Sequence, residues 1–233
     1  MQFELKKRLG LFFDFILPRF CVHCTKKLNV DENFICSACY EDIKSPDSHI
    51  LASEFRRKFD EKKLVSGFAS AFIFEKDSAV QSIIHSLKYN QNFNIGIYCG
   101  KLAAIELQNE LNSWNGDLIV PVPLHSLKKA ERGYNQSLYI AKGISSVNNL
   151  PVFSKVLERI RFTKSQTTMN MEERQKNISG AFRCKKVKQI SGRRIILVDD
   201  VITTGATTNE AASALLEAGA EKVFALSAAI AEV

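Results

Sequence analysis

The stretch IILVDDVITTGAT, residues 195–207, joins four apolar residues to an acidic pair and then to a loop of small and hydroxyl-bearing side chains. An unbroken run of branched apolar residues is typical of a parallel strand covered on both faces. Asp199 and Asp200 therefore come at the carboxyl end of a buried strand, the edge at which open α/β sheets bind ligands. Gly205 lets the backbone bend so that successive N–H groups converge on an anion. The stretch predicts a phosphate-binding loop beside two carboxylates.

Hydroxyl groups for this loop come from Thr203, Thr204 and Thr207, and a helix is expected to follow, entered at Asn209 and Glu210. The N-terminus of a helix adds a favourable dipole to a bound phosphate. Carboxylates accept O–H bonds strongly, so an acidic pair beside a phosphate loop suits a ligand with both phosphate and hydroxyl groups, such as a ribose 5-phosphate unit. The alternative is an ordinary strand-to-turn junction, in which Asp serves only the turn.

The same stretch resembles the phosphoribosyl-pyrophosphate (PRPP) signature of type I phosphoribosyltransferases along its whole length. The acidic pair of response-regulator receivers is a competing interpretation, but receivers carry that pair at the end of their first strand. Here only 33 of the 233 residues follow Asp200, and neither G-x-G-x-x-G nor G-x-x-x-x-G-K-[ST] occurs in the chain. By the resemblance, Asp199 and Asp200 hold the ribose 2′- and 3′-hydroxyls, and the 5′-phosphate is wrapped by Val201, Ile202, Thr203, Thr204, Gly205, Ala206 and Thr207.

Four of the six cysteines form two Cys-x-x-Cys pairs, Cys21 with Cys24 and Cys36 with Cys39, with 11 residues between the pairs. Two intervening residues let a tight turn direct both thiolates at one ion, and two such turns complete a tetrahedral zinc shell. Disulfides are the alternative, but a chain with no export signal should meet reducing conditions. A shell of four thiolates has no open coordination position, so the predicted zinc is structural. His23 is expected to be a bystander.

Length and composition indicate one α/β domain with a small appended module, since the chain has 233 residues and is 45% hydrophobic. No uninterrupted apolar run reaches about 18 residues, so no membrane span is expected. The basic and apolar N-terminus lacks a cleavage site, and a cytoplasmic location is expected. The predicted divisions are an amphipathic helix over 1–20, a four-cysteine zinc module over 21–44, a linker over 45–65 and the α/β domain over 66–233.

Strands and helices alternate along the larger domain, which predicts a parallel sheet. Strands are expected over 66–75, over 117–123, from Ile195 and over 223–229; helices are expected around Val80–Tyr89 and over 96–111, 138–144 and 211–218.

Two polar segments add candidate site residues. The strand that ends near Val122 opens into a basic loop, which is well placed to hold a pyrophosphate leaving group; a solvated surface loop is the alternative. A second segment, polar and cationic, suits a mobile flap that closes over an anionic ligand, the alternative being an exposed turn without function. The loop candidates are Pro123, Leu124, Lys128, Lys129 and Arg132, and the flap candidates are Lys164, Gln166, Arg174 and Asn177.

Together these motifs resemble the ComF competence-protein family over nearly the whole chain. The resemblance rests on the two Cys-x-x-Cys pairs, Leu87-Lys88-Tyr89, Pro-Val-Pro-Leu with Arg-Gly-Tyr-Asn-Gln, the flap residues Gln166, Arg174 and Asn177, and the Asp-Asp loop. It implies an α/β fold with the parallel sheet of a type I phosphoribosyltransferase and an N-terminal zinc ribbon. It also implies PRPP, with Mg²⁺, as ligand, and a link to DNA-uptake proteins in naturally transformable bacteria.

Positive charge is concentrated in residues 121–194, which hold 16 Lys and Arg against 4 Asp and Glu, whereas the whole chain has a net charge of +7. Such a surplus serves a polyphosphate ligand, a nucleic-acid backbone, or both. Two hypotheses follow: an enzyme that transfers ribose 5-phosphate from Mg-PRPP to an acceptor, and a binding protein that handles single-stranded DNA or senses PRPP without turnover. The oligomeric state is not predicted. Aromatic candidates for base stacking are Tyr134, Tyr139, Phe153, Phe162 and Phe182.

Overall fold

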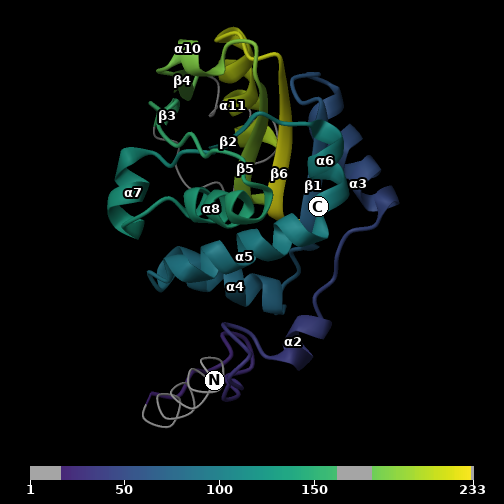
Figure 1. Cartoon of the computed structure of the whole chain (residues 1–233), viewed down its shortest axis with the longest axis vertical. Coiled ribbons are helices and arrows are strands. Elements are labelled where there is room, and N and C mark those ends of the chain that lie inside the picture. Colours follow the sequence, from purple (N-terminus) through teal and green to yellow (C-terminus); the bar gives the residue numbers. More distant parts are fainter. Residues whose placement is uncertain (1–16, 162–179, 232–233) are drawn as a thin grey trace, which may run out of the picture.

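A parallel sheet forms the centre of the molecule in the computed structural model, which describes residues 17–161 and 180–231. All its neighbouring strands are parallel, as the sequence predicted, and β5 and β6 lie inside the sheet (Figure 1). In order across the sheet, the strands are β1 (Gly67–Ile73), β6 (Lys222–Ile230), β5 (Arg194–Ile202) and β2 (Leu118–Pro121).

One face of the sheet packs on helices α4 (Ala79–Tyr89), α5 (Phe93–Glu106) and α8 (Gln136–Asn148). Helix α4 begins where the Ser78 hydroxyl accepts a hydrogen bond from the backbone N–H of Gln81, a typical N-cap. The helix predicted over 96–111 is interrupted at Leu107, so that α5 is followed by a separate helix, α6 (Gln108–Trp114).

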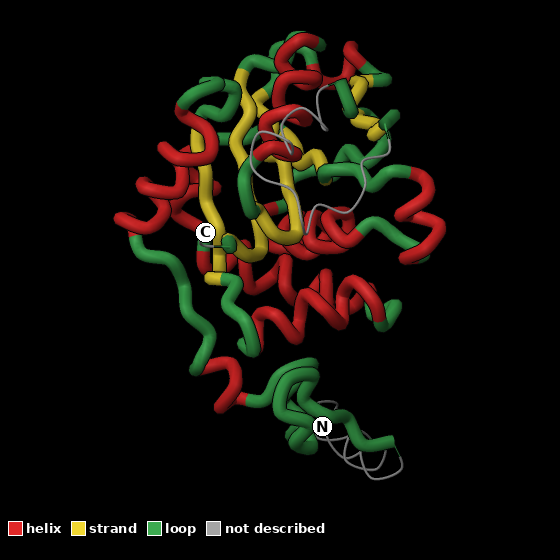
Figure 2. The backbone as a smooth tube through the Cα atoms, turned by 180° about the vertical axis from the view of Figure 1, so that it is seen from behind, coloured by secondary structure: helices red, strands yellow, loops and turns green. Residues whose placement is uncertain are grey.

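The other face packs on α11 (Ala206–Glu217) and on an antiparallel pair of strands, β3 (Leu157–Arg159) and β4 (Phe182–Cys184). Figure 2 shows the whole backbone from behind the view of Figure 1. The short helix α10 (Val187–Ile190) follows β4 and buries Ile190 in the same core. Because both faces are covered, β5 carries the unbroken apolar run from which its burial was predicted.

The linker expected over 45–65 contains helical structure: α3 (Ser48–Phe55) runs directly into a π-helical turn, η1 (Arg56–Asp60). Phe59 is fully buried against the sheet, with its ring 5.4 Å from that of Phe68 on β1. The charged run around Phe59 gave the segment the composition of a solvated linker. The buried ring of Phe59 and the buried ion pair of Glu54 with Lys58 anchor this segment to the body instead.

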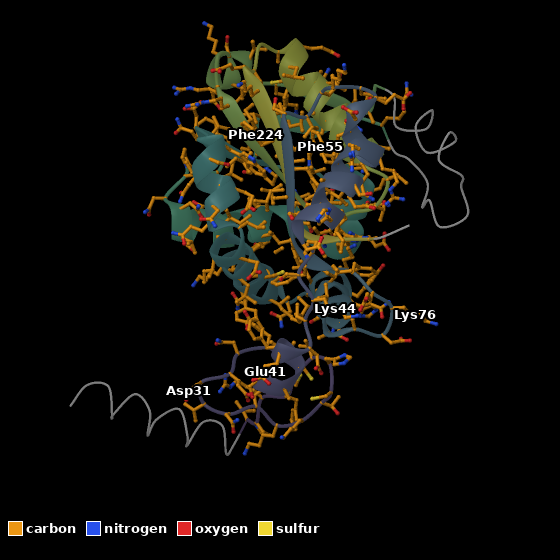
Figure 3. The ribbon with its side chains drawn as sticks, turned by 90° about the vertical axis from the view of Figure 1, so that its right-hand side faces the viewer. Asp31, Glu41, Lys44, Phe55, Lys76 and Phe224 are labelled. Carbon is orange, nitrogen blue, oxygen red and sulfur yellow. The ribbon has the colours of Figure 1, made fainter. Side chains whose placement is uncertain are left out.

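The cysteine-containing module lies beyond α4, at the N-terminal end of the described chain (Figures 1 and 2). Leu28 and Ile35 belong to the same buried cluster as α4 and α5, and the rings of Phe34 and Tyr98 are 5.5 Å apart. Helix α2 (Ser37–Glu41) ends the module. Figure 3 shows Asp31 and Glu41 on the module and Phe55 and Phe224 on the larger body. Between Cys24 and Cys36 the chain forms turns, and Lys27 makes an isolated antiparallel bridge with Phe20.

No helix within 17–161 or 180–231 is long and apolar enough to cross a membrane.

Candidate functional site

The acidic pair lies where β5 extends past its neighbour β2. The pairing of β2 with β5 ends at Val198, whereas β6 pairs with β5 as far as Ile202. Asp199 and Asp200 therefore follow the last paired residue on the β2 side, at the carboxyl edge of the sheet. The sequence predicted that the pair lies at this edge, but the strand β5 ends two residues after the pair, at Ile202.

Hydrogen bonds hold both carboxylates in place. Oδ1 of Asp199 accepts from the hydroxyl of Ser137 at 3.0 Å and from the backbone N–H of Asp200 at 2.9 Å. Oδ1 of Asp200 accepts from the backbone N–H of Val201 at 2.7 Å, and its Oδ2 lies 3.0 Å from Nζ of Lys88, at the end of α4. Three elements, β5, α8 and α4, thus fix the orientation of the pair.

The two carboxylates differ in charge state. Burial, and then repulsion from Asp200, raise the pKa of Asp199 to about 7. Burial also acts to raise the pKa of Asp200, but the ammonium group of Lys88 and a backbone N–H outweigh it, so the pKa of Asp200 lies below its usual range. Near neutral pH the pair therefore carries between one and two negative charges, and a ligand that donates O–H bonds to both carboxylates favours the fully ionised form.

Cations from separate elements surround the pair. Lys128 and Arg132 are on α7 (Ser126–Arg132), the basic loop of the sequence analysis, which forms a short helix in the structure. The charge of Arg132 helps to lower the pKa of Asp200. Burial, and then the nearby charges of Arg132 and Arg159, lower the pKa of Lys128. Burial lowers the pKa of Arg159, on β3, and the charge of Asp199 acts in the opposite direction. Such a cluster provides a strong positive potential for a polyanion next to two carboxylates.

The loop after the acidic pair forms a small cavity of about 30 Å³, which is lined by Asp199 and residues 201–208. Gly205 has a φ of +75°, a left-handed conformation that favours glycine. Helix α11 begins immediately after it, at Ala206, three residues before Asn209, where the sequence predicted that the helix is entered. The first N–H groups of a helix have no intrahelical acceptor, and they lie in this loop. A helix N-terminus arranged in this way suits an anion.

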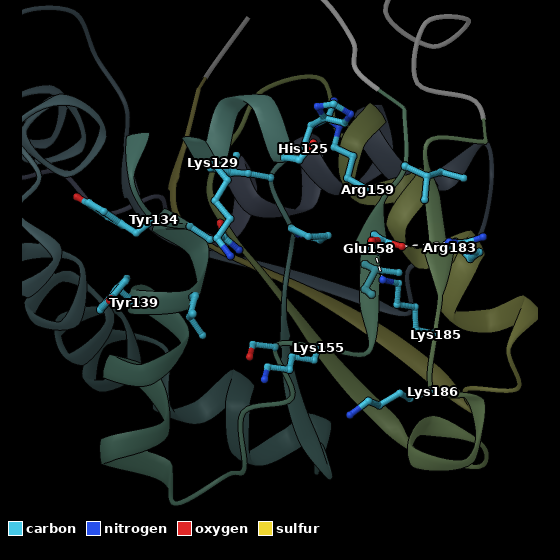
Figure 4. A pocket seen from close by; sticks show the side chains of 18 of the residues that line it. His125, Lys129, Tyr134, Tyr139, Lys155, Glu158, Arg159, Arg183, Lys185 and Lys186 are labelled. Atoms are coloured by element: carbon cyan, nitrogen blue, oxygen red, sulfur yellow. Dashed lines mark hydrogen bonds and ion pairs between the residues drawn. The ribbon is translucent and has the colours of Figure 1, made fainter. Parts of the chain in front are cut away.

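A larger groove of about 970 Å³ is lined by Arg159, whose charge interacts with that of Asp199. In Figure 4, Tyr134 and Tyr139 lie on one side of this groove, and Arg183 and Lys185 lie on the other. Its acidic lining residue, Glu158, is paired with both of these cations, at 3.2 Å and 2.7 Å. Of the predicted loop residues, those that line the groove are Pro123, Leu124 and Lys129; the other basic side chains in the lining are His125, Lys155 and Lys186.

The flap candidates Lys164, Gln166, Arg174 and Asn177 lie outside the described residues. The segment that carries them connects β3 to β4, and just after it the backbone N–H of Gly180 donates to Oε1 of Glu210 on α11 at 2.5 Å.

The four cysteines Cys21, Cys24, Cys36 and Cys39 come together, with their sulfur atoms all within 4.8 Å of one another. The sulfurs of Cys24 and Cys36 are 3.6 Å apart. Zn–S bonds of about 2.3 Å in a tetrahedron separate the sulfurs by about 3.8 Å, so the cluster fits a metal ion such as zinc. The ring of His23 points elsewhere, with Nδ1 3.0 Å from the Ser82 hydroxyl on α4.

Three residues at the acidic pair were not among the predicted site residues: Lys88, Ser137 and Arg159. Lys88 was noted in the sequence only as part of a motif, because no local pattern pairs it with a carboxylate 112 positions later. Ser137 follows the Arg-Gly-Tyr-Asn-Gln motif at the start of α8. Arg159 falls in a short strand without a recognisable motif, so nothing in the sequence indicated its position.

Comparisons with known proteins match most of the chain. The family model for the phosphoribosyl transferase domain matches residues 85–229. Competence protein F of Haemophilus influenzae is 28% identical over 213 residues, which cover 87% of this chain and 93% of that protein. The DNA utilization protein YhgH of Escherichia coli K12 is 32% identical over 207 residues, 87% of this chain and 86% of that protein. Competence protein ComFC of Bacillus subtilis is 32% identical over 102 residues, 44% of this chain and 39% of that protein.

Proposed function

The chain belongs to the ComF family and contains a phosphoribosyl transferase domain, and from this premise we propose that it binds Mg-PRPP and transfers its ribose 5-phosphate to an acceptor, with release of pyrophosphate. The observation that carries the proposal is the position of Asp199 and Asp200 between an anion-binding loop and a cluster of cations. The loop matches a phosphate, the acidic pair matches two neighbouring hydroxyls, and the cations match a pyrophosphate, so PRPP has a group for each of the three features.

Each part of the site has a role in this proposal. Residues 201–207 hold the 5′-phosphate with backbone N–H groups and threonine hydroxyls. Asp199 and Asp200 accept hydrogen bonds from the two ribose hydroxyls. Lys128, Lys129 and Arg132 lie toward the pyrophosphate, and the flap residues Lys164, Gln166, Arg174 and Asn177 would close over it.

The reaction breaks the bond between C1′ and the pyrophosphate oxygen, which keeps the electron pair, and the acceptor's nucleophilic atom forms a new bond to C1′. Negative charge grows on the leaving pyrophosphate, while the ribose ring becomes positive and resembles an oxocarbenium ion. The fixed cations on α7 stabilise the first charge, and the adjacent carboxylates stabilise the second. Mg²⁺, when bound with PRPP, would neutralise part of the pyrophosphate charge.

For the four cysteines we propose a structural zinc ion that holds the module of residues 21–44 together. The support is the tetrahedral fit of the sulfur atoms and a cluster with four protein ligands, which leaves no position for a substrate.

Calorimetric titration with PRPP, with and without Mg²⁺, tests the ligand. We expect Mg²⁺-dependent binding of about one PRPP per chain, because a single acidic pair and a single adjoining loop form the proposed site. Pyrophosphate release in the presence of candidate acceptors then tests turnover. A folded, zinc-loaded protein that binds neither PRPP nor ribose 5-phosphate would contradict the proposal.

A second candidate function is the handling of single-stranded DNA, and the basic groove is the observation that favours it. Lys155 and Lys186 line it together with Tyr134 and Tyr139, which offers both phosphate contacts and aromatic faces for bases. DNA affinity that falls steeply with salt, and that Lys155→Glu/Lys186→Glu abolishes while PRPP binding persists, would support this function. Lys62→Glu/Lys63→Glu, on exposed residues after η1, is the control with the same charge change.

A further inference from the structure

A buried cation, Lys58, lies directly beneath the loop that follows the acidic pair. It stands in the π-helical turn η1 with 5% of its surface exposed, and its Nζ is 2.6 Å from Oε2 of Glu54, which is 8% exposed. Charged side chains are almost never this buried unless they are paired. π-Helical turns are rare and frequently occur at functional sites.

The ammonium group of Lys58 joins three elements that are far apart in the sequence. Besides Glu54, Nζ donates to the backbone carbonyl of Thr203, in the loop, and to that of Ala231, just after β6, at 3.3 Å. These three acceptors use all three donors of an ammonium group. The backbone N–H of Ala231 in turn donates to the carbonyl of Ile202 at 3.1 Å. Lys58 therefore anchors the point where β5 becomes the loop.

The backbone of η1 also contacts the loop closely. Nδ2 of Asn209, in the first turn of α11, donates to the carbonyl of Lys58 at 2.7 Å. A Cβ atom added to Gly205 would lie 3.1 Å from that carbonyl oxygen and 3.0 Å from Cβ of Lys58. Both the left-handed φ of Gly205 and its missing side chain are thus needed for η1 to lie against the loop.

The bond to Thr203 sets the direction of the next N–H group. In a planar trans peptide, the C=O of one residue and the N–H of the following residue point to opposite sides, and the described chain has no cis peptide bond. Because Lys58 holds the Thr203 carbonyl from beneath, the N–H of Thr204 is directed away from Lys58. Lys58 does not line the small cavity, whereas Thr203 and Thr204 do.

We propose that Lys58 is a positioning residue, which fixes the Thr203–Thr204 peptide so that the Thr204 N–H is directed at the bound phosphate, and that Glu54 is the counterion that keeps this cation in place. The effect of Lys58 on phosphate binding rests on the proposed function, whereas its effect on the conformation of the loop does not. The pair thereby makes the segment of residues 45–65 part of the site.

The competing explanation is a purely structural ion pair that stabilises the fold and leaves the loop unaffected. The double variant Glu54→Leu/Lys58→Met distinguishes between the two explanations. Apolar replacement of a buried ion pair is often neutral for stability. Arg57, which also pairs with Oε2 of Glu54 at 2.5 Å, is partly exposed and can be solvated when Glu54 is replaced. The double variant therefore keeps the packing but removes the donor to Thr203.

The first measurement is the backbone ¹⁵N order parameters of residues 203–207 in the ligand-free protein. We expect them to fall from about 0.85 to below about 0.6 in the double variant, the range of a flexible backbone. Lys62→Met, an exposed residue of the same segment, is the matched control and should change nothing. If the double variant fails to fold, Lys58→Met alone is measured in its place, with the same fall expected; it removes the donor to Thr203, and Glu54 keeps Arg57 as its partner.

The second measurement is the affinity for ribose 5-phosphate and, separately, for Mg-pyrophosphate. Loss of one oriented donor should weaken ribose 5-phosphate binding about tenfold and leave pyrophosphate binding unchanged. Wild-type order parameters and affinities in a folded variant that lacks the ammonium group would overturn the proposal. A looser loop in a protein whose wild type binds no ribose 5-phosphate would uphold the positioning role and reject the proposed ligand.

Discussion

The double variant Asp199→Asn/Asp200→Asn is expected to bind Mg-PRPP at least about 100-fold more weakly than the wild type. Two hydrogen bonds from ribose hydroxyls to carboxylates become bonds to neutral amides, and a bond to a charged group is worth about 1–1.5 kcal/mol more than a bond to a neutral one. Together with the loss of two charges that bind Mg-PRPP, two such differences amount to about two factors of ten. Calorimetric titration in Mg²⁺, with thermal unfolding recorded on the same sample, measures the effect.

Asp117→Asn is the control, because it makes the same type of substitution, with the loss of one negative charge instead of two, just before β2 of the same sheet. Asp117 accepts a hydrogen bond from the backbone N–H of Arg194 at 2.7 Å, near the amino end of β5 and away from the acidic pair. An asparagine oxygen can accept the same bond, so PRPP affinity should stay at the wild-type value. Equal affinities for the wild type and a folded double variant would show that the acidic pair does not hold the ribose.

The single variant Asp199→Asn adds a pH dependence to this test. The pKa of Asp199 is about 7 in the folded protein and about 3.9 in an unfolded chain. Folding therefore takes up a proton between these values, so the stability contributed by Asp199 is present below about pH 4 and is lost as the pH rises to 7. If PRPP binds only when Asp199 is ionised, the PRPP affinity of the wild type should fall about tenfold from pH 8 to pH 6. This fall is counted after subtracting the change that the Asp199→Asn variant shows over the same pH range.

Local patterns were sufficient to predict the sheet and the loop. The apolar run of β5, the small-residue loop after Asp200 and the strand that becomes β2 each follow from neighbouring residues. The cysteine cluster followed from spacing alone, since two short Cys-x-x-Cys turns restrict where four sulfurs can meet. The family model that matches residues 85–229 agrees with the type I phosphoribosyltransferase fold.

Long-range pairs were beyond such patterns. Lys88 meets Asp200, and Lys58 meets Thr203, across more than a hundred residues. The charged run around Lys58 has the composition of a solvated segment. The burial of Lys58 depends on Glu54 and on two backbone carbonyls from distant parts of the chain. The start of α11 was misjudged because residues 206–210 include two threonines and an asparagine, which are weak helix formers in a helix interior but suit a first turn.

Removal of zinc is expected to unfold the module of residues 21–44 and to loosen the face of α4 on which it packs. A segment of this length buries too little apolar surface to fold alone, and structural zinc contributes about 10–16 kcal/mol in zinc-finger peptides, which is comparable to the stability of a whole small domain. Leu28 and Ile35 share a buried cluster with α4 and α5, so they should become exposed together. Amide hydrogen exchange with and without a chelator measures the loss.

Cys36→Ser should give the same result without a chelator, with zinc content falling from about one ion per chain to none. Cys184→Ser is the matched control, because Cys184 lies on β4, outside the cluster, and should leave one zinc per chain. The effect should also reach the acidic pair, since α4 carries both Ser82, which contacts His23 of the module, and Lys88, which pairs with Asp200. A Cys36→Ser protein that keeps its zinc and its slow exchange would refute the four-thiolate site. Unchanged PRPP affinity after zinc loss would confine the metal's role to the module.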